Sequence, residues 1–189
     1  GRLQPFIATL ITMTAYRGLA LIITDGKPVS RLAASVKSAS GAFLFKVLGK
    51  GNFVFGPNDA ISIPIPAIIL VVLLLVFYFV LHHTTFGRRI YATGSNEKCA
   101  KLVGVNTTKI KIAVYSISGF MSALAGLIMI SRVDSAQPTL GEGYELDAIA
   151  AVALGGTSMS GGRGKIVGTL AGVLIIAVLN NGLNILGVS

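Results

Sequence analysis

Four long apolar runs divide this chain, with polar stretches between them. Each run has about 20 residues, the length at which an α-helix crosses the roughly 30 Å hydrocarbon core of a bilayer. Only one of them holds a charged residue, Arg17. Buried helices of a large soluble protein are the alternative, but these are usually shorter than a full span. The pattern therefore predicts an all-α, polytopic membrane helix bundle, with spans at about 6–24, 64–83, 112–131 and 166–186.

A fifth apolar run, Ala148–Leu154, is too short for a full crossing. We expect a short, partly re-entrant helix at about 147–156, packed inside the bundle, because broken helices at membrane depth must be covered by protein or line a cavity. Seven glycines fall between Gly141 and Gly164. They do not form a nucleotide loop, because Lys165 is followed by Ile166 where Ser or Thr is needed. We interpret them as packing and turn positions.

Charge is concentrated in the loops and orients the bundle. Hydrophobic residues make up 53% of the chain and charged residues 12%, against about a quarter in soluble domains. The net charges are +3 for 25–63, +5 for 84–111, −3 for 132–147 and +2 for 157–165. Since Lys and Arg are enriched in short cytoplasmic loops, we place 84–111 and 157–165 in the cytoplasm and the other two outside. A net charge of +9 thus reflects topology, and not nucleic-acid binding.

The 84–111 loop also contains the pattern of a short capped helix. Asn96 suits the N-cap, Glu97 the first turn and Gly104 the C′ position. Cys99, Leu102 and Val103 share one apolar face at i, i+3, i+4 spacing. Such a short helix is marginal in water alone. We expect it to dock on a partner through this face; a turn lying on the lipid surface is the alternative.

Polar residues within the predicted spans are candidates for a translocation path, because burying them in lipid is costly. The candidates are Arg17, Asn180, Asn181 and Asn184. Hydrogen bonds between helices are an equal alternative for the asparagines, and snorkelling or a carbonyl contact is favoured for Arg17. Gly168 and Gly172 form a G-x-x-x-G pair that allows close helix approach. We expect that pair to pack within the subunit. The sequence indicates no catalytic or metal-ligating set.

Several motifs resemble the sugar permeases of bacterial ABC importers, the ribose permeases among them. In YATGSNEKCAKLVGVN the matching positions are Gly94, Asn96, Ala100 and Gly104. Further likeness covers RLQPFIATL near the start, GYELDAIAAVALGGTSMSGGRG at 143–164 and LNNGLNILGVS at 179–189. Family members are longer, and this chain begins Gly1-Arg2 and stops directly after an apolar run. We therefore expect residues 1–189 to be a single transmembrane domain, incomplete at both ends.

The resemblance implies a permease of the type II importer kind that carries ribose or a related monosaccharide across the bacterial inner membrane. Its implied partners are a second permease copy, a periplasmic sugar-binding protein and an ATPase subunit that holds ATP and Mg²⁺, with no cofactor in this chain. Gly94–Gly104 would then be the cytoplasmic coupling segment. The expected coupling residues are Gly94, Asn96, Glu97, Ala100, Leu102, Val103 and Gly104. The alternatives are an ion-coupled secondary transporter and a structural membrane subunit.

Overall fold

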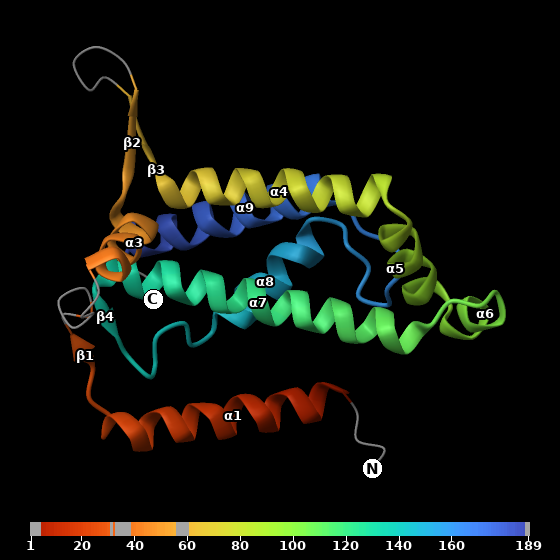
Figure 1. Ribbon diagram of the computed structural model, residues 1–189, viewed down its shortest axis with the longest axis horizontal. Coiled ribbons are helices and arrows are strands. Elements are labelled where there is room, and N and C mark those ends of the chain that lie inside the picture. The colour runs from red at the N-terminus through yellow and green to blue at the C-terminus, as the bar shows by residue number, and fades with distance from the viewer. Residues whose placement is uncertain (1–4, 31, 33–38, 56–60, 188–189) are drawn as a thin grey trace. The chain divides into compact units, whose positions relative to one another are not determined.

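Long helices dominate the computed structural model, which describes residues 5–30, 32, 39–55 and 61–187 (Figure 1). Within those residues, four helices are long and apolar enough to cross a membrane. They are α1 (Pro5–Thr24), α4 (Ile65–His83), α7 (Thr107–Val133) and α9 (Ile166–Ile185). A helix occupies each predicted span, although α4 begins one residue later and α9 ends one residue earlier than predicted. α7 starts five residues before the predicted span, because the prediction counted only the uncharged stretch and the helix continues through Lys109 and Lys111.

The surfaces of these helices are apolar and uncovered. Leu75 of α4 is 64% exposed and Phe79 is 60% exposed. In the most apolar windows of α1, α4 and α7, none of the residues is buried by the rest of the described protein. A soluble protein rarely leaves apolar patches of this size open to water. The chain is a multi-pass membrane protein whose long helices face lipid or further helices.

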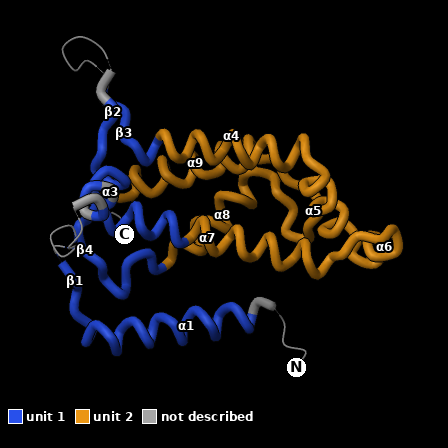
Figure 2. Tube along the Cα trace, viewed as in Figure 1, with its two compact units in different colours: residues 1–67, 123–142 blue, residues 68–122, 143–189 orange. Residues whose placement is uncertain are grey.

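The fold has two compact units, residues 1–67 with 123–142 and residues 68–122 with 143–189 (Figure 2). The first unit contains α1, α3 (Ala39–Lys50) and the four short strands. β1 (Val29–Ser30) pairs antiparallel with β4 (Ser135–Ala136), and β2 (Asn52–Phe55) pairs antiparallel with β3 (Ile61–Pro64). These strands were not predicted and add two small two-stranded sheets to the helical fold.

The first unit brings two distant loops together. The β1–β4 pair joins the 25–63 stretch to residues after α7. At the end of α7 the Ser131 hydroxyl, in a residue only 2% exposed, donates to the carbonyl oxygen of Phe45. Loops that touch in this way lie on one side of the membrane, as the charge pattern predicts for 25–63 and 132–147. Arg31, Lys37 and Asp59, which were counted in that pattern, lie outside the described residues, as do 2–4 and 188–189 of the family motifs.

The second unit contains most of α4 and α7, together with α5 (Thr85–Ser95), α6 (Glu97–Leu102), α8 (Tyr144–Leu154) and α9. α8 is the predicted short helix; it begins three residues earlier and ends two residues earlier than expected. Its 11 residues span about 16 Å, roughly half of the hydrocarbon core. α8 runs antiparallel along α9, since Gly155 adjoins Gly168 while Ala151 adjoins Gly172.

Backbone contact at glycine holds the α8–α9 pair together. A Cβ on Gly155 would stand 2.5 Å from the carbonyl oxygen of Gly168, and a Cβ on Gly172 would overlap the carbonyl oxygen of Ala151. Ala151 is 2% exposed. The G-x-x-x-G pair of α9 therefore packs within the subunit, as predicted. After α8 the chain turns through Gly156, Gly161 and Gly162 with φ of +78°, +89° and +75°, values that glycine adopts without strain.

Candidate functional site

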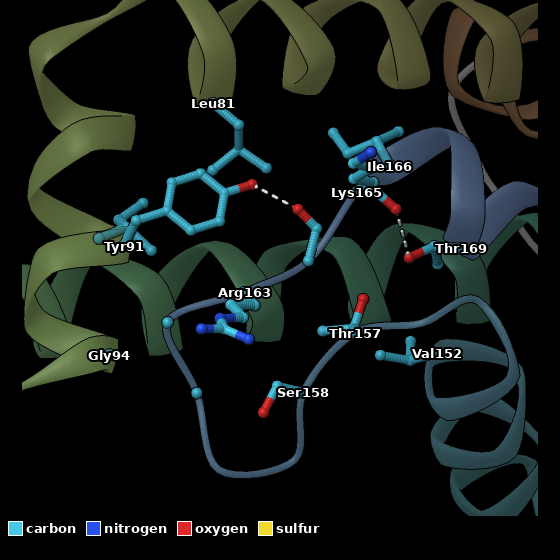
Figure 3. A pocket seen from close by; sticks show the side chains of 14 residues that line it. Leu81, Tyr91, Gly94, Val152, Thr157, Ser158, Arg163, Lys165, Ile166 and Thr169 are labelled. Atoms are coloured by element: carbon cyan, nitrogen blue, oxygen red, sulfur yellow. Dashed lines mark hydrogen bonds between the residues drawn. The ribbon is translucent and has the colours of Figure 1, made fainter.

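The candidate coupling segment begins with α5, which lies directly after α4. The Thr84 hydroxyl caps the helix by accepting from the Gly87 amide at 3.2 Å. Further along α5, the Tyr91 hydroxyl donates to the carbonyl oxygen of Gly164 at 3.0 Å (Figure 3). The 157–165 loop is thereby fixed to α5. Both segments were assigned to the cytoplasm on charge, and their contact agrees with a common side.

Gly94 lies at the closest approach between α5 and that loop. A Cβ on Gly94 would stand 2.7 Å from the amide nitrogen of Gly162, and a Cβ on Gly162 would stand 2.7 Å from Cα of Ser95. Beside this contact is a cavity of about 370 Å³ whose polar lining includes Ser158 and Arg163 (Figure 3). The structure therefore places Gly94 where α5 contacts the 157–165 loop, and the residue itself is exposed.

α6 has the predicted caps at both ends. The Asn96 Oδ1 atom accepts from the Cys99 amide at 3.1 Å. Gly104 has φ +81°, its amide donates to Lys101, and the Val105 amide donates to Ala100, each at 3.0 Å. These two bonds form a Schellman motif, which satisfies carbonyl groups at the end of a helix. The sequence signals for the start and the end of this helix are thus confirmed.

A cluster of charged groups joins α6 to the start of α7, and we call it the Glu97 cluster: Glu97, Lys101, Thr107 and Lys111. One carboxylate oxygen of Glu97 accepts from Lys111 Nζ at 2.6 Å. The other lies 2.9 Å from Lys101 Nζ and accepts from the Thr107 hydroxyl at 3.2 Å. The bonds from Lys111 and then Lys101 lower the pKa of Glu97 to about 2. Sequence reasoning missed Thr107 and Lys111, because helix spacing alone does not reveal contacts with the next helix.

The two sides of α6 differ sharply in exposure. Leu102 is 87% exposed, Val103 is 78% exposed and Cys99 is also exposed. Ala100 is only 3% exposed, and Thr107 and Ile110 at the start of α7 are 1% and 8% exposed. The predicted apolar face is therefore open. Ala100, one of the expected coupling residues, is buried on a helix that packs against α5 and is bonded to α7 through Glu97.

Among the predicted path residues, Asn180 has a defined partner. Its Nδ2 atom donates to Oδ2 of Asp147, the bond length being 3.1 Å. The pair lines a hollow of about 410 Å³ between α8 and α9, which we call the α8–α9 hollow. It is lined by Tyr144, Asp147, Ala148, Ala151, Val173, Ile176, Ala177 and Asn180. Asn181 and Asn184 are exposed on α9 and are outside this lining.

Arg17 is held in a different place. Its Nη1 atom lies 3.1 Å from Oε1 of Glu142, within the first unit. Snorkelling or a carbonyl contact was expected for Arg17, and the structure shows an ion pair with a residue 125 positions away instead. The partners of Arg17 and Asn180 are both acidic: Glu142 lies just before α8, and Asp147 lies in its first turn. Sequence reasoning counted them only as loop charge.

Comparison with known proteins identifies the family. Residues 2–189 match the family described as branched-chain amino acid transport system / permease component. The chain belongs to that family. The ribose import permease protein RbsC of Bacillus subtilis (strain 168) is 54% identical over 189 residues, which are 100% of this chain and 54% of that protein. No solved structure matches the chain.

Two further relatives extend the likeness to sugar permeases. RbsC of Escherichia coli (strain K12) is 50% identical over 189 residues, 100% of this chain and 55% of that protein. The L-arabinose transport system permease protein AraH of the same strain is 42% identical over 188 residues, 100% of this chain and 52% of that protein. The chain thus spans about half the length of the curated relatives that it matches.

Proposed function

We propose that this chain belongs to the permease subunit of an ATP-driven importer that carries ribose or a related monosaccharide across the bacterial inner membrane. The observation that carries the proposal is the capped helix α6, which is fixed to a long apolar helix and keeps Leu102 and Val103 exposed. Ribose is favoured over arabinose because identity to the two RbsC proteins is 54% and 50%, against 42% to AraH.

In this proposal the energy source is a separate ATPase subunit that binds ATP and Mg²⁺. The open face of α6, formed by Cys99, Leu102 and Val103, enters a groove on that subunit. A helix of six residues that leaves large apolar side chains in water gains stability when a partner covers them. A periplasmic sugar-binding protein delivers the sugar from outside, and a second permease copy completes the path.

The proposed orientation places α5, α6 and the 157–165 loop in the cytoplasm. Two observations support it: the excess of Lys and Arg in these segments, and the bond from Tyr91 to Gly164 that holds them together. The loops of the first unit are then periplasmic. Closure of the ATPase moves α5 and α6, and rocking of the helices exposes the path alternately to each side.

Asn180, with Asn181 and Asn184 toward the outer end of α9, contributes neutral hydrogen-bonding groups to the path. An ion-coupled transporter, the main alternative, needs an ionisable group free to change its charge near mid-membrane. Arg17 does not suit that role, since it is paired with Glu142. Asp147 of α8 is the other ionisable candidate, and the ion-gradient experiment below tests it. A purely structural membrane subunit would tolerate loss of the asparagines without loss of uptake.

Purification in detergent tests the proposal. The permease, tagged and expressed with the ATPase subunit of a sugar importer, is expected to copurify with that ATPase and to support ATP-dependent uptake of labelled ribose in vesicles. Uptake driven by an ion gradient without ATP would establish the secondary transporter. If there is no uptake and no ATPase copurifies, the alternative of a structural membrane subunit is supported.

A further inference from the structure

The lining of the α8–α9 hollow is mostly apolar, but it includes a carboxylate, an amide and an aromatic ring. We propose that Asp147, Asn180 and Tyr144 contact the monosaccharide as it passes through the permease; this rests on the proposed function. The carboxylate of Asp147 accepts hydrogen bonds, and the amide of Asn180 can both donate and accept them. Sugar hydroxyls match these groups, since each also donates and accepts. Tyr144, 53% exposed, adds a flat ring against which the C–H groups of a sugar can pack.

The Asp147–Asn180 pair lies at a depth where burying an ionisable side chain without a function would cost free energy. Asn180 lies 14 residues after Ile166, which is about 21 Å along a helix of about 30 Å. If α9 spans the bilayer, the pair lies inside the hydrocarbon thickness. An ionisable residue at such depth faces protein or a water-filled cavity, and it marks a substrate or ion path more often than a packing position. The hollow of about 410 Å³ has the volume of small-molecule sites.

Packing of α8 does not depend on this pair. The contacts of Gly155 with Gly168 and of Ala151 with Gly172 already join the two helices backbone to backbone. Asp147 and Asn180 form a separate contact nearer the start of α8, where the hollow opens. A polar pair that is not needed for packing is free to exchange its bond for bonds to sugar hydroxyls.

Asp147→Asn tests this inference in the importer assembled with its ATPase. The new amide oxygen still accepts from Asn180, so packing and ATPase association should remain. Loss of the charged acceptor should lower the maximal rate of ribose uptake about tenfold. Glu145→Gln is the matched control: Glu145 lies in the same first turn but does not line the hollow, and its uptake should change less than twofold. Tyr144→Leu, at an exposed position, should also lower uptake several-fold.

Three outcomes decide the inference. Reduced uptake in Asp147→Asn and Tyr144→Leu, with normal thermal stability and ATPase association, supports it. Unchanged uptake in both variants overturns the sugar contact but not the proposed function. If Asp147→Asn instead lowers the melting temperature while Tyr144→Leu transports normally, the pair is a structural bond and the inference fails. Absence of uptake in the unaltered importer overturns the proposed function itself.

A second inference rests on an independent contact, the Glu97 cluster. We infer that Glu97 is a positioning residue that transmits movement of α6 to the transmembrane helix α7. The carboxylate reaches across to Lys111 at 2.6 Å and Thr107 at 3.2 Å. Exposed ion pairs add little to stability, but short charge-assisted bonds fix geometry. With Ala100 and Ile110 buried beside it, the cluster gives α6 a fixed orientation on α7.

Transport stoichiometry tests this role. Glu97→Gln and Lys111→Gln should each lower the ratio of sugar transported to ATP hydrolysed several-fold while the ATPase still copurifies. The double variant should be no worse than either single change, because both remove the same link. Lys98→Gln is the control, since Lys98 is exposed on α6 and is not a member of the cluster. An unchanged ratio in Glu97→Gln, or loss of the ATPase from it, would overturn the inference.

Discussion

Two short helices, α6 and α8, are held in place by different kinds of contact. α6 has six residues and depends on side chains: an Asn cap, a Schellman turn and the Glu97 cluster. α8 has 11 residues and depends on backbone contact with α9 at glycine. Each also exposes groups that do not match its surroundings. In the proposed topology, α6 presents apolar side chains in a basic, water-facing segment, whereas α8 presents a carboxylate at membrane depth.

The comparison shows where to look for function in a membrane protein. A long apolar helix is explained by lipid alone, so its exposed leucines carry little information. An apolar face in water calls for a protein partner, and a charged group at membrane depth calls for water or a solute. By this criterion Leu102 with Val103, and Asp147 with Asn180, are the informative positions of the chain.

The largest effect is expected from a substitution at the glycine of α9 that contacts the backbone of α8, compared with a substitution elsewhere on α9. Gly172→Ala places a Cβ against the carbonyl oxygen of Ala151, which can move only if α8 shifts. We expect a loss of about 3 kcal/mol in stability. Gly182→Ala, the same change in open space on the same helix, should be neutral or stabilising by up to about 1 kcal/mol. Melting in detergent measures both, and equal melting temperatures would contradict the glycine contact.

A smaller effect is expected on the inner face of α6. Ala100→Leu adds bulk at a position that is 3% exposed, which should cost about 2 kcal/mol and loosen α6 from α7. Cys99→Leu, on the exposed face, should cost little. Hydrogen exchange at the Val105 amide, which bonds to the carbonyl of Ala100, reports the loosening. Faster exchange in Cys99→Leu than in Ala100→Leu would reverse the assignment of the two faces.

Removing the N-cap of α6 should have a milder effect. Asn96→Ala removes the acceptor of the Cys99 amide and should cost about 1 kcal/mol. The start of α6 is then expected to fray while α8 is unaffected. Amide exchange compared between the two helices checks this. Equal changes in both would show that they are not held independently.

The smallest effect is expected when the pH is lowered and Glu97 is protonated. Bonds to Lys111 and Lys101 lower the pKa of Glu97 from its ordinary value of 4.5 to about 2 in the folded chain. Because the folded value is the lower one, the stabilising contribution is complete above about pH 5 and declines as pH falls from 4.5 toward 2. A spin label on the exposed Cys99 should gain mobility over that window, whereas Glu97→Gln should show no such transition. A transition above pH 6 would have another origin.

The sequence predicted the features that depend on local spacing. Run length located the spans, and cap residues located α6. The G-x-x-x-G pair predicted packing within the subunit, but it did not identify α8 as the partner. Long-range pairs were not predictable in this way. β1 meets β4 across about a hundred residues, and Arg17 meets Glu142 across 125. The burial of Ala100 was missed for the same reason, since the orientation of α6 depends on contacts with α7.

The central claim is that the open face of α6 receives an ATPase. Its most direct test is copurification of that ATPase with Leu102→Asp/Val103→Asp, compared with Ile185→Asp/Leu186→Asp at similarly exposed positions at the end of α9. We expect the α6 variant to keep its melting temperature, to lose at least nine-tenths of the ATPase and to stop ATP-dependent uptake. The α9 variant, if it folds, should retain the ATPase. Full retention of the ATPase by the folded α6 variant would show that the open face of α6 is not the ATPase contact.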